Sequence, residues 1–428
     1  MVTRAKDRFQ VIGHPSIGFY GLVTVLLAVF GWGIYAYYRE FTEGMAQTGL
    51  RDIGTMGGAT WGLYVAFIIY FVGVSFAGIT TAALVRMLNL RQLRPISRIA
   101  ELLTIIALIL AACSVLVDLG QPLRGIVNLF RYARPQSPFF GTFTLVISGY
   151  LFASLVYFYL DGRRDAALLA RYPSRLRWFY RLWAAGYRHT PAERRRHEIA
   201  SFWLAIAILP LLVTAHSTLG FVFGIQSGRP GWFSALQAPG FVVMAGISGL
   251  GLLAVIAAVI RVTSGAGKQV IPEDVFRYLG IFLAGLILTY LYFTVAELLT
   301  IMYAGPRHDV ETTWALLAGE YAWMFWGSVG SLVFSLILLA GSIFVLRRHI
   351  IGSAVVSGLL VNLAAIGKRF LIVVPSQTVG PLLPYGAGHY APTWVEYSIV
   401  LGLFALGTLM FALFSRIFPL IELAEEVE

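Results

Sequence analysis

Residues 102–124 read LLTIIALILAACSVLVDLGQPLR, an uncharged apolar run that ends at Asp118 and is followed by a glycine, a proline and Arg124. A helix needs about 20 predominantly apolar residues to cross the hydrocarbon core of a bilayer. A carboxylate at the rim of such a helix is costly, so it is rarely found there without a function. The stretch therefore predicts a membrane-spanning helix that ends in a functional carboxylate. A solvated helix end, with Asp118 paired to Arg124, is the alternative that the stretch alone leaves open.

The composition extends this interpretation to the whole chain. Hydrophobic residues make up 58% of the sequence and charged residues 12%, which is far more apolar than an ordinary soluble domain. The single cysteine, Cys113, excludes a disulfide framework, a cysteine-ligated iron–sulfur cluster and a thiolate zinc site within this chain. The predicted fold class is an all-α polytopic membrane protein in a lipid bilayer.

Ten apolar segments are long enough to cross the membrane as helices. We interpret the first as a retained anchor, because it lacks the small-residue cleavage site of a signal peptide. The predicted spans are residues 16–38, 58–85, 99–118, 139–160, 199–222, 240–262, 278–304, 322–346, 350–374 and 395–416.

The positions of the basic residues predict the orientation, because loops rich in Lys and Arg stay in the cytoplasm. With the N-terminus inside, 23 of the 32 Lys and Arg residues fall on the cytoplasmic side. Both termini are therefore predicted to be cytoplasmic. The basic loops account for the net charge of +11, so nucleic acid is not an expected partner.

The longest predicted cytoplasmic loop, residues 161–198, combines ten arginines with a group of aromatic residues. This mixture is typical of a helix that lies at the level of the lipid headgroups. A surface for docking a partner is the competing interpretation. The aromatic residues are Trp178, Phe179, Tyr180 and Trp183.

Spans two to five and six to nine can be laid over each other as two parallel four-helix repeats. Asp118 lies 20 positions after Arg98, and Glu297 lies 20 positions after Arg277. The predicted domains are residues 1–57 with the anchor helix and an outer loop, 58–239 with the first four-helix unit, 240–394 with the second unit, and 395–428 with the last helix and a cytoplasmic tail.

Ionisable residues gather at one depth of the predicted helices. At a rise of 1.5 Å per residue from the cytoplasmic end of each span, they lie in the outer third of the bilayer. These residues are Asp118, His216, Glu297, Lys368 and Arg369. The second span begins at the same level with Trp61 and Tyr64. Glu101 lies near the cytoplasmic end of span three, where snorkelling or a pair with Arg98 is the ordinary explanation.

His216 is the only histidine well inside a predicted span. A bis-histidine haem needs a second buried histidine, so we expect no haem in this chain. A neutral imidazole near a carboxylate can hydrogen-bond a quinol hydroxyl and accept its proton. A core histidine bonded to a backbone carbonyl is the alternative interpretation.

These motifs resemble the NrfD-like family, the membrane subunits of polysulfide reductase and its relatives. The matching pieces are Asp118-Leu119-Gly120 with Pro122 and Arg124, Ser137-Pro138, and Trp61-Gly62-Leu63-Tyr64. The C-terminal half is similar to the long ten-helix members, as in alternative complex III and related menaquinone complexes. That comparison depends on Arg229-Pro230-Gly231-Trp232, Lys368-Arg369-Phe370 and Pro392-Thr393-Trp394-Val395-Glu396.

The resemblance implies a quinol site in the first four-helix unit of a respiratory or photosynthetic electron-transfer complex. It implies an extracytoplasmic iron–sulfur subunit as electron partner, with further cytochrome c or molybdopterin-type and membrane subunits. The bound group would be a quinone, menaquinone or ubiquinone, with no haem, iron–sulfur cluster or metal in this chain. His216 and Asp118 would bind and deprotonate the quinol, with Trp61, Tyr64 and Arg124 shaping the pocket. The residues assigned to a proton path are Glu297, Lys368, Arg369 and Glu101.

Two other function classes stay open at this stage. Parallel repeats with polar groups at the midplane also describe secondary transporters, but these carry interrupted helices in matching positions of both halves. No such pair is evident in the sequence. A purely structural membrane anchor of a redox complex is the third class, and bound quinone would separate the first class from both others.

Overall fold

The computed structural model describes residues 16–53, 61–87, 90–132, 134, 136–137, 144–264, 267–379 and 388–423. All regular elements in these ranges are helices, so the all-α prediction is confirmed. Nine helices in this part of the chain are long and apolar enough to cross a membrane. A tenth crossing is made by two shorter helices that follow each other directly, α3 and α4.

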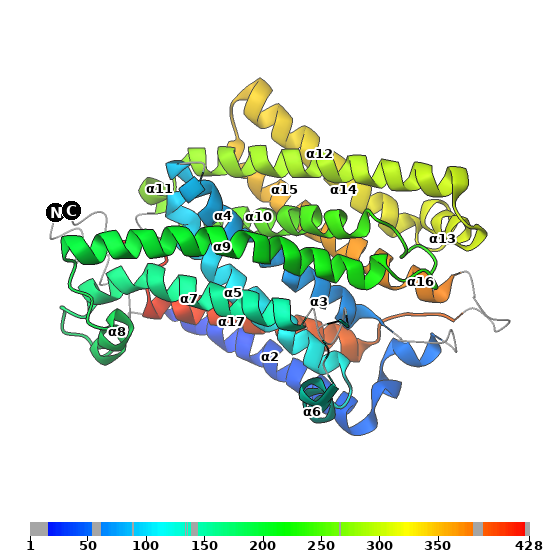
Figure 1. Cartoon of the computed structure of the whole chain (residues 1–428), viewed down its shortest axis with the longest axis horizontal. Coiled ribbons are helices and arrows are strands. Elements are labelled where there is room, and N and C mark those ends of the chain that lie inside the picture. The colour runs from blue at the N-terminus through cyan, green and yellow to red at the C-terminus, as the bar shows by residue number, and fades with distance from the viewer. Residues whose placement is uncertain are drawn as a thin grey trace.

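The long helices run side by side along the longest axis of the molecule (Figure 1). They are α2 Ile17–Glu43, α3 Leu63–Val74, α4 Phe76–Met87, α5 Ser97–Asp118, α7 Thr144–Leu169, α9 Pro191–Gly224, α10 Gln237–Thr263, α12 Glu273–Ala304, α14 Ala322–Ala340, α15 Ile350–Val373 and α17 Trp394–Ile417. The shorter elements are η1 Met45–Gln47, η2 Gly49–Asp52, η3 Arg91–Ile96, α6 Pro122–Tyr132, α8 Arg177–Ala184, α11 Gly267–Val270, α13 Arg307–Leu317, η5 Gly341–Leu346 and α16 Pro375–Thr378.

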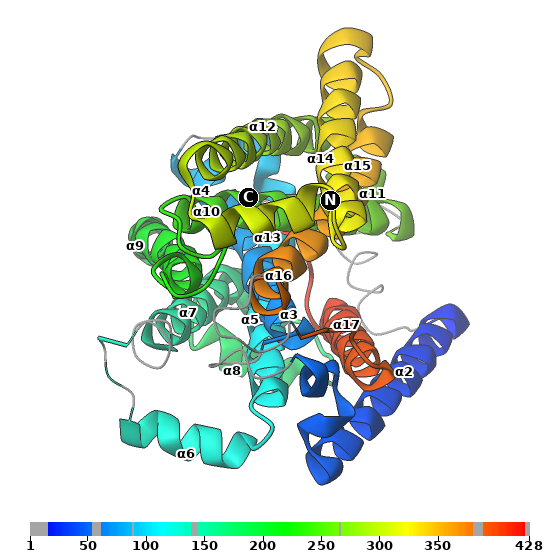
Figure 2. The ribbon, with the colours of Figure 1, turned by 90° about the vertical axis from the view of Figure 1, so that its right-hand side faces the viewer.

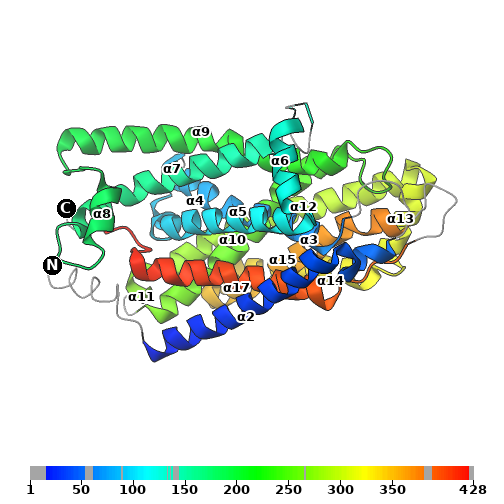
Figure 3. The same ribbon diagram turned by 90° about the horizontal axis from the view of Figure 1, so that it is seen from below.

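The first and last long helices start and finish at the same end of the bundle. Figure 3 shows α2 beginning, and α17 ending, on the left of the view. A chain that crosses the membrane an even number of times, such as the ten predicted, starts and finishes on the same side. We call the opposite end, where α5 ends and α17 begins, the Asp118 end. The predicted orientation depends on how the basic residues are distributed over the loops, and some of them, Arg4 to Arg8, lie outside the described ranges. The orientation stays a prediction.

Two helices are longer than predicted. Helix α7 continues to Leu169, and α9 begins at Pro191 rather than at residue 199. The side chain of Thr190 and that of Glu193 cap the start of α9 reciprocally, which satisfies backbone donors that the first turn leaves free. Both extensions are rich in arginine, so apolar length alone does not reveal them. The basic loop therefore shrinks to a short connection that contains the eight-residue α8.

The second span is broken at Ser75, between α3 and α4. Side chains of three other helices satisfy the backbone at the break. The Ser75 carbonyl accepts hydrogen bonds from Thr104 Oγ1 at 2.7 Å and from the Tyr150 hydroxyl at 2.8 Å. The Val72 carbonyl lies 2.9 Å from Nε2 of His216. The corresponding helix of the second unit, α10, is continuous, so these two spans are not the matched interrupted pair of a transporter.

The two predicted four-helix units share one apolar core. Helix α3 of the first unit packs against α5 of its own unit and against α10 and α15 of the second. One cluster of buried side chains runs through both sets of helices. In the end-on view of Figure 2, α2 and α17 lie together at the edge of the bundle. The division into two repeats stays a prediction.

Helices α2 and α17 approach each other at two glycines. A Cβ atom on Gly33 would lie 2.8 Å from Cα of Gly402 and 3.1 Å from the carbonyl oxygen of Ser398. Nothing lies within 4 Å of the same position at Gly31, one half-turn earlier. Small residues let helices pack backbone to backbone in membranes, so Gly33 fixes how closely the first helix approaches the last.

We expect Gly33→Ala to destabilise the protein by about 1–3 kcal/mol, because the added methyl forces two backbones apart. Gly31→Ala is the matched control and is expected to leave stability unchanged or slightly raised. Thermal unfolding of both variants in detergent measures the difference. Equal melting temperatures would show that the close approach of α2 and α17 is dispensable.

Candidate functional site

Three carboxylates from distant parts of the chain meet at the Asp118 end. We call Glu40, Asp118 and Glu396, with the phenols of Tyr64 and Tyr390, the acidic cluster. Glu40 interacts electrostatically with both Asp118 and Glu396. The carboxylates belong to α2, α5 and α17, so the cluster forms only when the first, third and last spans have come together.

The two phenols donate hydrogen bonds to two of these carboxylates. Tyr64 donates to Oε2 of Glu40 at 2.5 Å, and Tyr390 donates to Oε1 of Glu396. Burial, followed by the neighbouring Glu396 carboxylate, raises the pKa of the Tyr390 phenol, so this phenol stays a donor. The other oxygen of Glu396 accepts from the backbone N–H groups of Gly49 and Thr393, both at 2.8 Å.

Two buried oxygens of the acidic cluster remain available to accept a hydrogen bond. Oε1 of Glu40 and Oδ1 of Asp118 have no hydrogen-bond partner among the described residues. A buried acceptor without a donor costs free energy. A ligand that carries hydroxyl or N–H groups would satisfy both oxygens. The predicted site residues Asp118 and Tyr64 are thus brought into one cluster.

Trp61 lies just before α3, between the two units, on the side of the helix start that faces away from the acidic cluster. Its ring stacks on Trp232, with centroids 5.4 Å apart and planes at 18°, and meets Phe223 edge-on. Its backbone exchanges two hydrogen bonds with the Gln377 side chain, of 2.9 and 2.8 Å. Trp61 therefore anchors α3 to the second unit, while Tyr64 faces the acidic cluster.

His216 lies at the break of the second span rather than in the acidic cluster. The side chain is 1% exposed, and Nδ1 lies 2.8 Å from the Leu212 carbonyl while Nε2 faces Val72. Arg369 interacts electrostatically with this ring and stacks on Phe241 at 4.3 Å. Counted along α3, Val72 is eight residues, or roughly 12 Å, from Tyr64. The neighbours of the His216 ring are thus Leu212, Val72, Phe76 and Tyr150 rather than Asp118.

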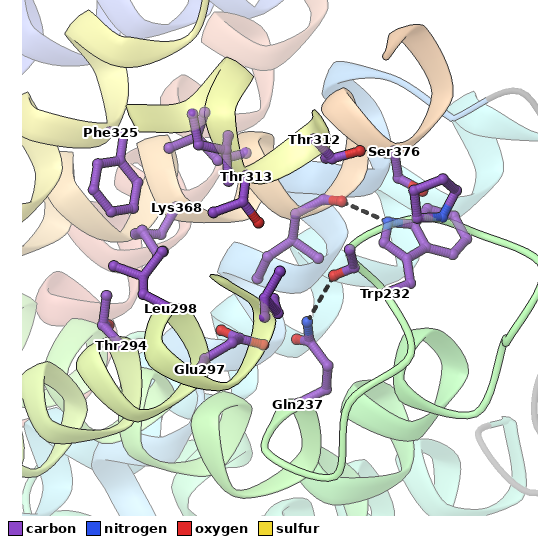
Figure 4. A pocket seen from close by; sticks show the side chains of 16 residues that line it. Trp232, Gln237, Thr294, Glu297, Leu298, Thr312, Thr313, Phe325, Lys368 and Ser376 are labelled. Atoms are coloured by element: carbon purple, nitrogen blue, oxygen red, sulfur yellow. Dashed lines mark hydrogen bonds between the residues drawn. The ribbon is translucent and has the colours of Figure 1, made fainter. Parts of the chain in front are cut away.

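Glu297 and Lys368 share a cavity in the second unit (Figure 4). The cavity has a volume of about 60 Å³, enough for a few water molecules. The Glu297 carboxylate interacts electrostatically with Lys368 and bonds the Ser234 side chain. The Lys368 ammonium lies 5.1 Å from the centroid of Phe325. Hydroxyl groups on the cavity wall come from Thr294, Thr312, Thr313 and Ser376.

The last two predicted residues lie away from these places. Arg124 is exposed on α6, an amphipathic helix whose apolar side chains, such as Phe130 at 86% exposure, also face outward. Glu101 is buried one turn after Arg98, toward the far end of α5. In the described part of the chain, no three His, Cys, Asp or Glu side chains are grouped so as to hold a metal ion.

A family model described as polysulphide reductase, NrfD, matches residues 52–380. The chain belongs to this family. The match contains both the acidic residue Asp118 and the cavity residues Glu297 and Lys368, but it leaves out α2 and α17 entirely. The predicted resemblance is therefore confirmed at the level of the family, and the predicted multi-pass membrane protein with it.

Curated relatives match this NrfD-family chain over nearly its whole length. A putative membrane subunit of the dimethyl sulfoxide reductase of Halobacterium salinarum is 30% identical, over 96% of this chain and 92% of the relative. A subunit of the selenate reductase of Mesobacillus selenatarsenatis is 27% identical, over 94% and 95%. An Hdr-like menaquinol oxidoreductase integral membrane subunit of Archaeoglobus fulgidus is 26% identical, over 96% of each chain.

Three members of the acidic cluster, Glu40, Glu396 and Tyr390, are absent from the predicted site residues. Glu40 stands near the end of the first span, which we interpreted as an anchor only, and Glu396 stands at the start of the last. An acidic residue inside an apolar helix is a signal in itself. What the sequence does not reveal is that the last span packs against α5 and that the first span packs against the last.

Proposed function

We propose that the chain is the quinone-reactive membrane subunit of an oxidoreductase complex, with the quinol head group bound at the acidic cluster. The observation that carries this proposal is the pair of buried, unpaired carboxylate oxygens of Asp118 and Glu40 next to the Tyr64 phenol. Quinol oxidation releases two protons with two electrons, and a buried site needs a base within hydrogen-bond reach of the hydroxyl. Asp118 supplies that base.

The relatives support the same chemistry. One is named as a menaquinol oxidoreductase subunit, and a fourth, from Nitratidesulfovibrio vulgaris, as a menaquinone reductase integral membrane subunit at 22% identity. In our proposal the electrons pass to or from a one-electron centre, such as an iron–sulfur cluster, in a partner at the Asp118 end. That end is extracytoplasmic in the proposed orientation, with both termini in the cytoplasm.

A binding titration tests this proposal without any substitution. The purified chain in lipid nanodiscs is titrated with a short-chain menaquinone, and quenching of tryptophan fluorescence reports binding. We expect saturable binding of about one equivalent, since one cluster offers free acceptors. A structural anchor or a transporter of another solute would show no saturation.

For the second unit we propose proton transfer through the Glu297–Lys368 cavity. The pair faces a space large enough for a few water molecules, and hydroxyl groups line its wall. Ordered water between an acid and a base can relay protons, because each water both donates and accepts hydrogen bonds. Arg369 and Glu101 stay predictions for this path, because the structure places neither of them on the cavity.

We expect Glu297→Gln and Lys368→Ala to lower the rate of proton movement in proteoliposomes at least about tenfold, while quinone affinity changes less than about twofold. Glu320→Gln is the control, since Glu320 is half-exposed beside His389. Removing one partner of a buried charge pair also destabilises a fold, so the amount of assembled protein is measured in parallel. Lost quinone affinity with intact proton movement would mean that the roles of the two units are reversed.

A further inference from the structure

We infer that Glu40 accepts the second proton of the quinol, alongside Asp118. This inference is built on the proposed function, and it assigns a role to a residue of the first span. Three features of the acidic cluster support this role: the free oxygen of Glu40, the occupied oxygens of Glu396, and the mutual repulsion of the three carboxylates.

The Glu40 side chain is held so that one oxygen remains available. It is 2% exposed, and Tyr64 fixes its Oε2 through a bond of 2.5 Å. Oε1 has no hydrogen-bond partner among the described residues. A carboxylate oxygen can accept a hydrogen bond and then the proton itself. The phenol orients the group without using up both oxygens.

Glu396 is not available for the same role, although it belongs to the same cluster. Its Oε1 accepts from Tyr390, and its Oε2 accepts from the backbone N–H groups of Gly49 and Thr393. These bonds occupy both oxygens of the carboxylate and also cap the start of α17. Glu396 thus has no oxygen left for the quinol, and Glu40 is the neighbour that can take a proton.

Electrostatics favours proton uptake at Glu40. Asp118 and Glu396 both interact with it electrostatically, and no Lys or Arg side chain of the described residues is found in an ion pair with any of the three. The nearby Arg39 pairs with Glu43 instead, on the exposed side of α2. Like charges in a low-dielectric site repel each other, and a proton on Glu40 relieves this repulsion.

The step is balanced as follows. Both hydroxyl O–H bonds of the quinol break, one proton goes to Oδ1 of Asp118, and the other goes to Oε1 of Glu40. Two electrons leave, one at a time, to the one-electron centre of the redox partner, and the quinone remains. Quinone reduction is the same step in reverse, with both carboxyl groups as proton donors.

Glu40→Gln tests the inference, with Glu43→Gln as the matched control one turn later on α2. The assembled complex is assayed with a short-chain quinol across the acidic pH range. For the wild type, the logarithm of turnover should rise with pH at a slope of two, because two carboxylates must be ionised. We expect Glu40→Gln to lower turnover about 100-fold, to reduce the slope to one and to keep quinone binding. Glu43→Gln should match the wild type.

Unchanged turnover and slope in Glu40→Gln would overturn the inference. If Asp118→Asn were inactive at the same time, the proposed quinol site would stand and only the role of Glu40 would fail. Absent quinone binding in the wild type would instead remove the proposed function itself. Should Glu40→Gln fail to assemble, Glu40→Asp decides the question, because it keeps a carboxylate and should keep a slope of two at a lower rate. A slope of one in that variant would contradict the inference.

Discussion

Asp118→Asn is expected to abolish quinol turnover in a complex that still assembles. Asparagine keeps the size of the side chain and removes its ability to take a proton. Loss of one general base typically lowers a rate by a factor of about 10² to 10⁴, or about 3–5 kcal/mol of barrier. The measurement is steady-state oxidation of a short-chain quinol, with the redox partner verified as bound.

The control for Asp118→Asn is Asp52→Asn, a half-exposed aspartate at the same end that pairs with Arg51. It should retain normal turnover. His216→Ala belongs in the same series, because a role of His216 in quinol binding stays a prediction. Its ring lies at the break at Ser75, so a lower melting temperature with turnover kept would assign His216 to the break, whereas lost turnover in the assembled protein would support the predicted role. Normal turnover of Asp118→Asn would leave that residue as a simple helix end.

The second large effect is expected at the opposite end of the bundle. Arg98 is 2% exposed and bonds Asp165 at 2.5 Å and Asp161 at 3.0 Å, both on α7. It also donates to the carbonyls of Pro419 and Ile421 in the segment after α17. Arg98→Ala leaves two buried carboxylates without their cation, which typically costs about 3–5 kcal/mol.

Arg94→Ala is the matched control for Arg98→Ala, because Arg94 lies one turn earlier and pairs with Glu422 while 40% exposed. Its partner Glu422 is 19% exposed, so solvent screens this pair more than the Arg98 network, and losing it is expected to cost about 0–1 kcal/mol. Unfolding of both variants, followed by intrinsic fluorescence in mixed detergent micelles, compares the losses. If Arg98→Ala is no less stable than Arg94→Ala, the buried ion network does not hold the C-terminal segment in place.

The spans were predictable because each crosses hydrocarbon and must therefore be apolar. The predicted span 99–118 and α5 coincide to within two residues at its start. The end of α7 and the start of α9 were not predictable from hydropathy, since the last turns of α7 and the first turns of α9 lie beyond the apolar run and carry arginines. No proline lies at the break at Ser75, so the sequence does not predict it. The side chains that stabilise the break come from α5, α7 and α9.

The candidate site was predictable only in part. An intramembrane charge is expensive, so Asp118, Glu297 and Lys368 stood out, but the partners of each depend on packing between distant helices. We grouped His216 with Asp118 because both were predicted to lie at the same depth in the membrane. In the structure they lie on two helices, α9 and α5, and have different neighbours. Trp61 and Tyr64 are three residues apart, and because α3 begins between them, one faces the second unit and the other faces the acidic cluster.

The position of a bound quinone tests the central claim most directly. A density map of the protein in nanodiscs, saturated with a short-chain menaquinone, would show the head group. We predict that one ring oxygen lies within hydrogen-bond distance of the Asp118 carboxyl group, with the Tyr64 and Glu40 side chains beside the ring. A head group found instead in the cavity between Glu297 and Lys368, with the acidic cluster empty, would contradict the proposed site.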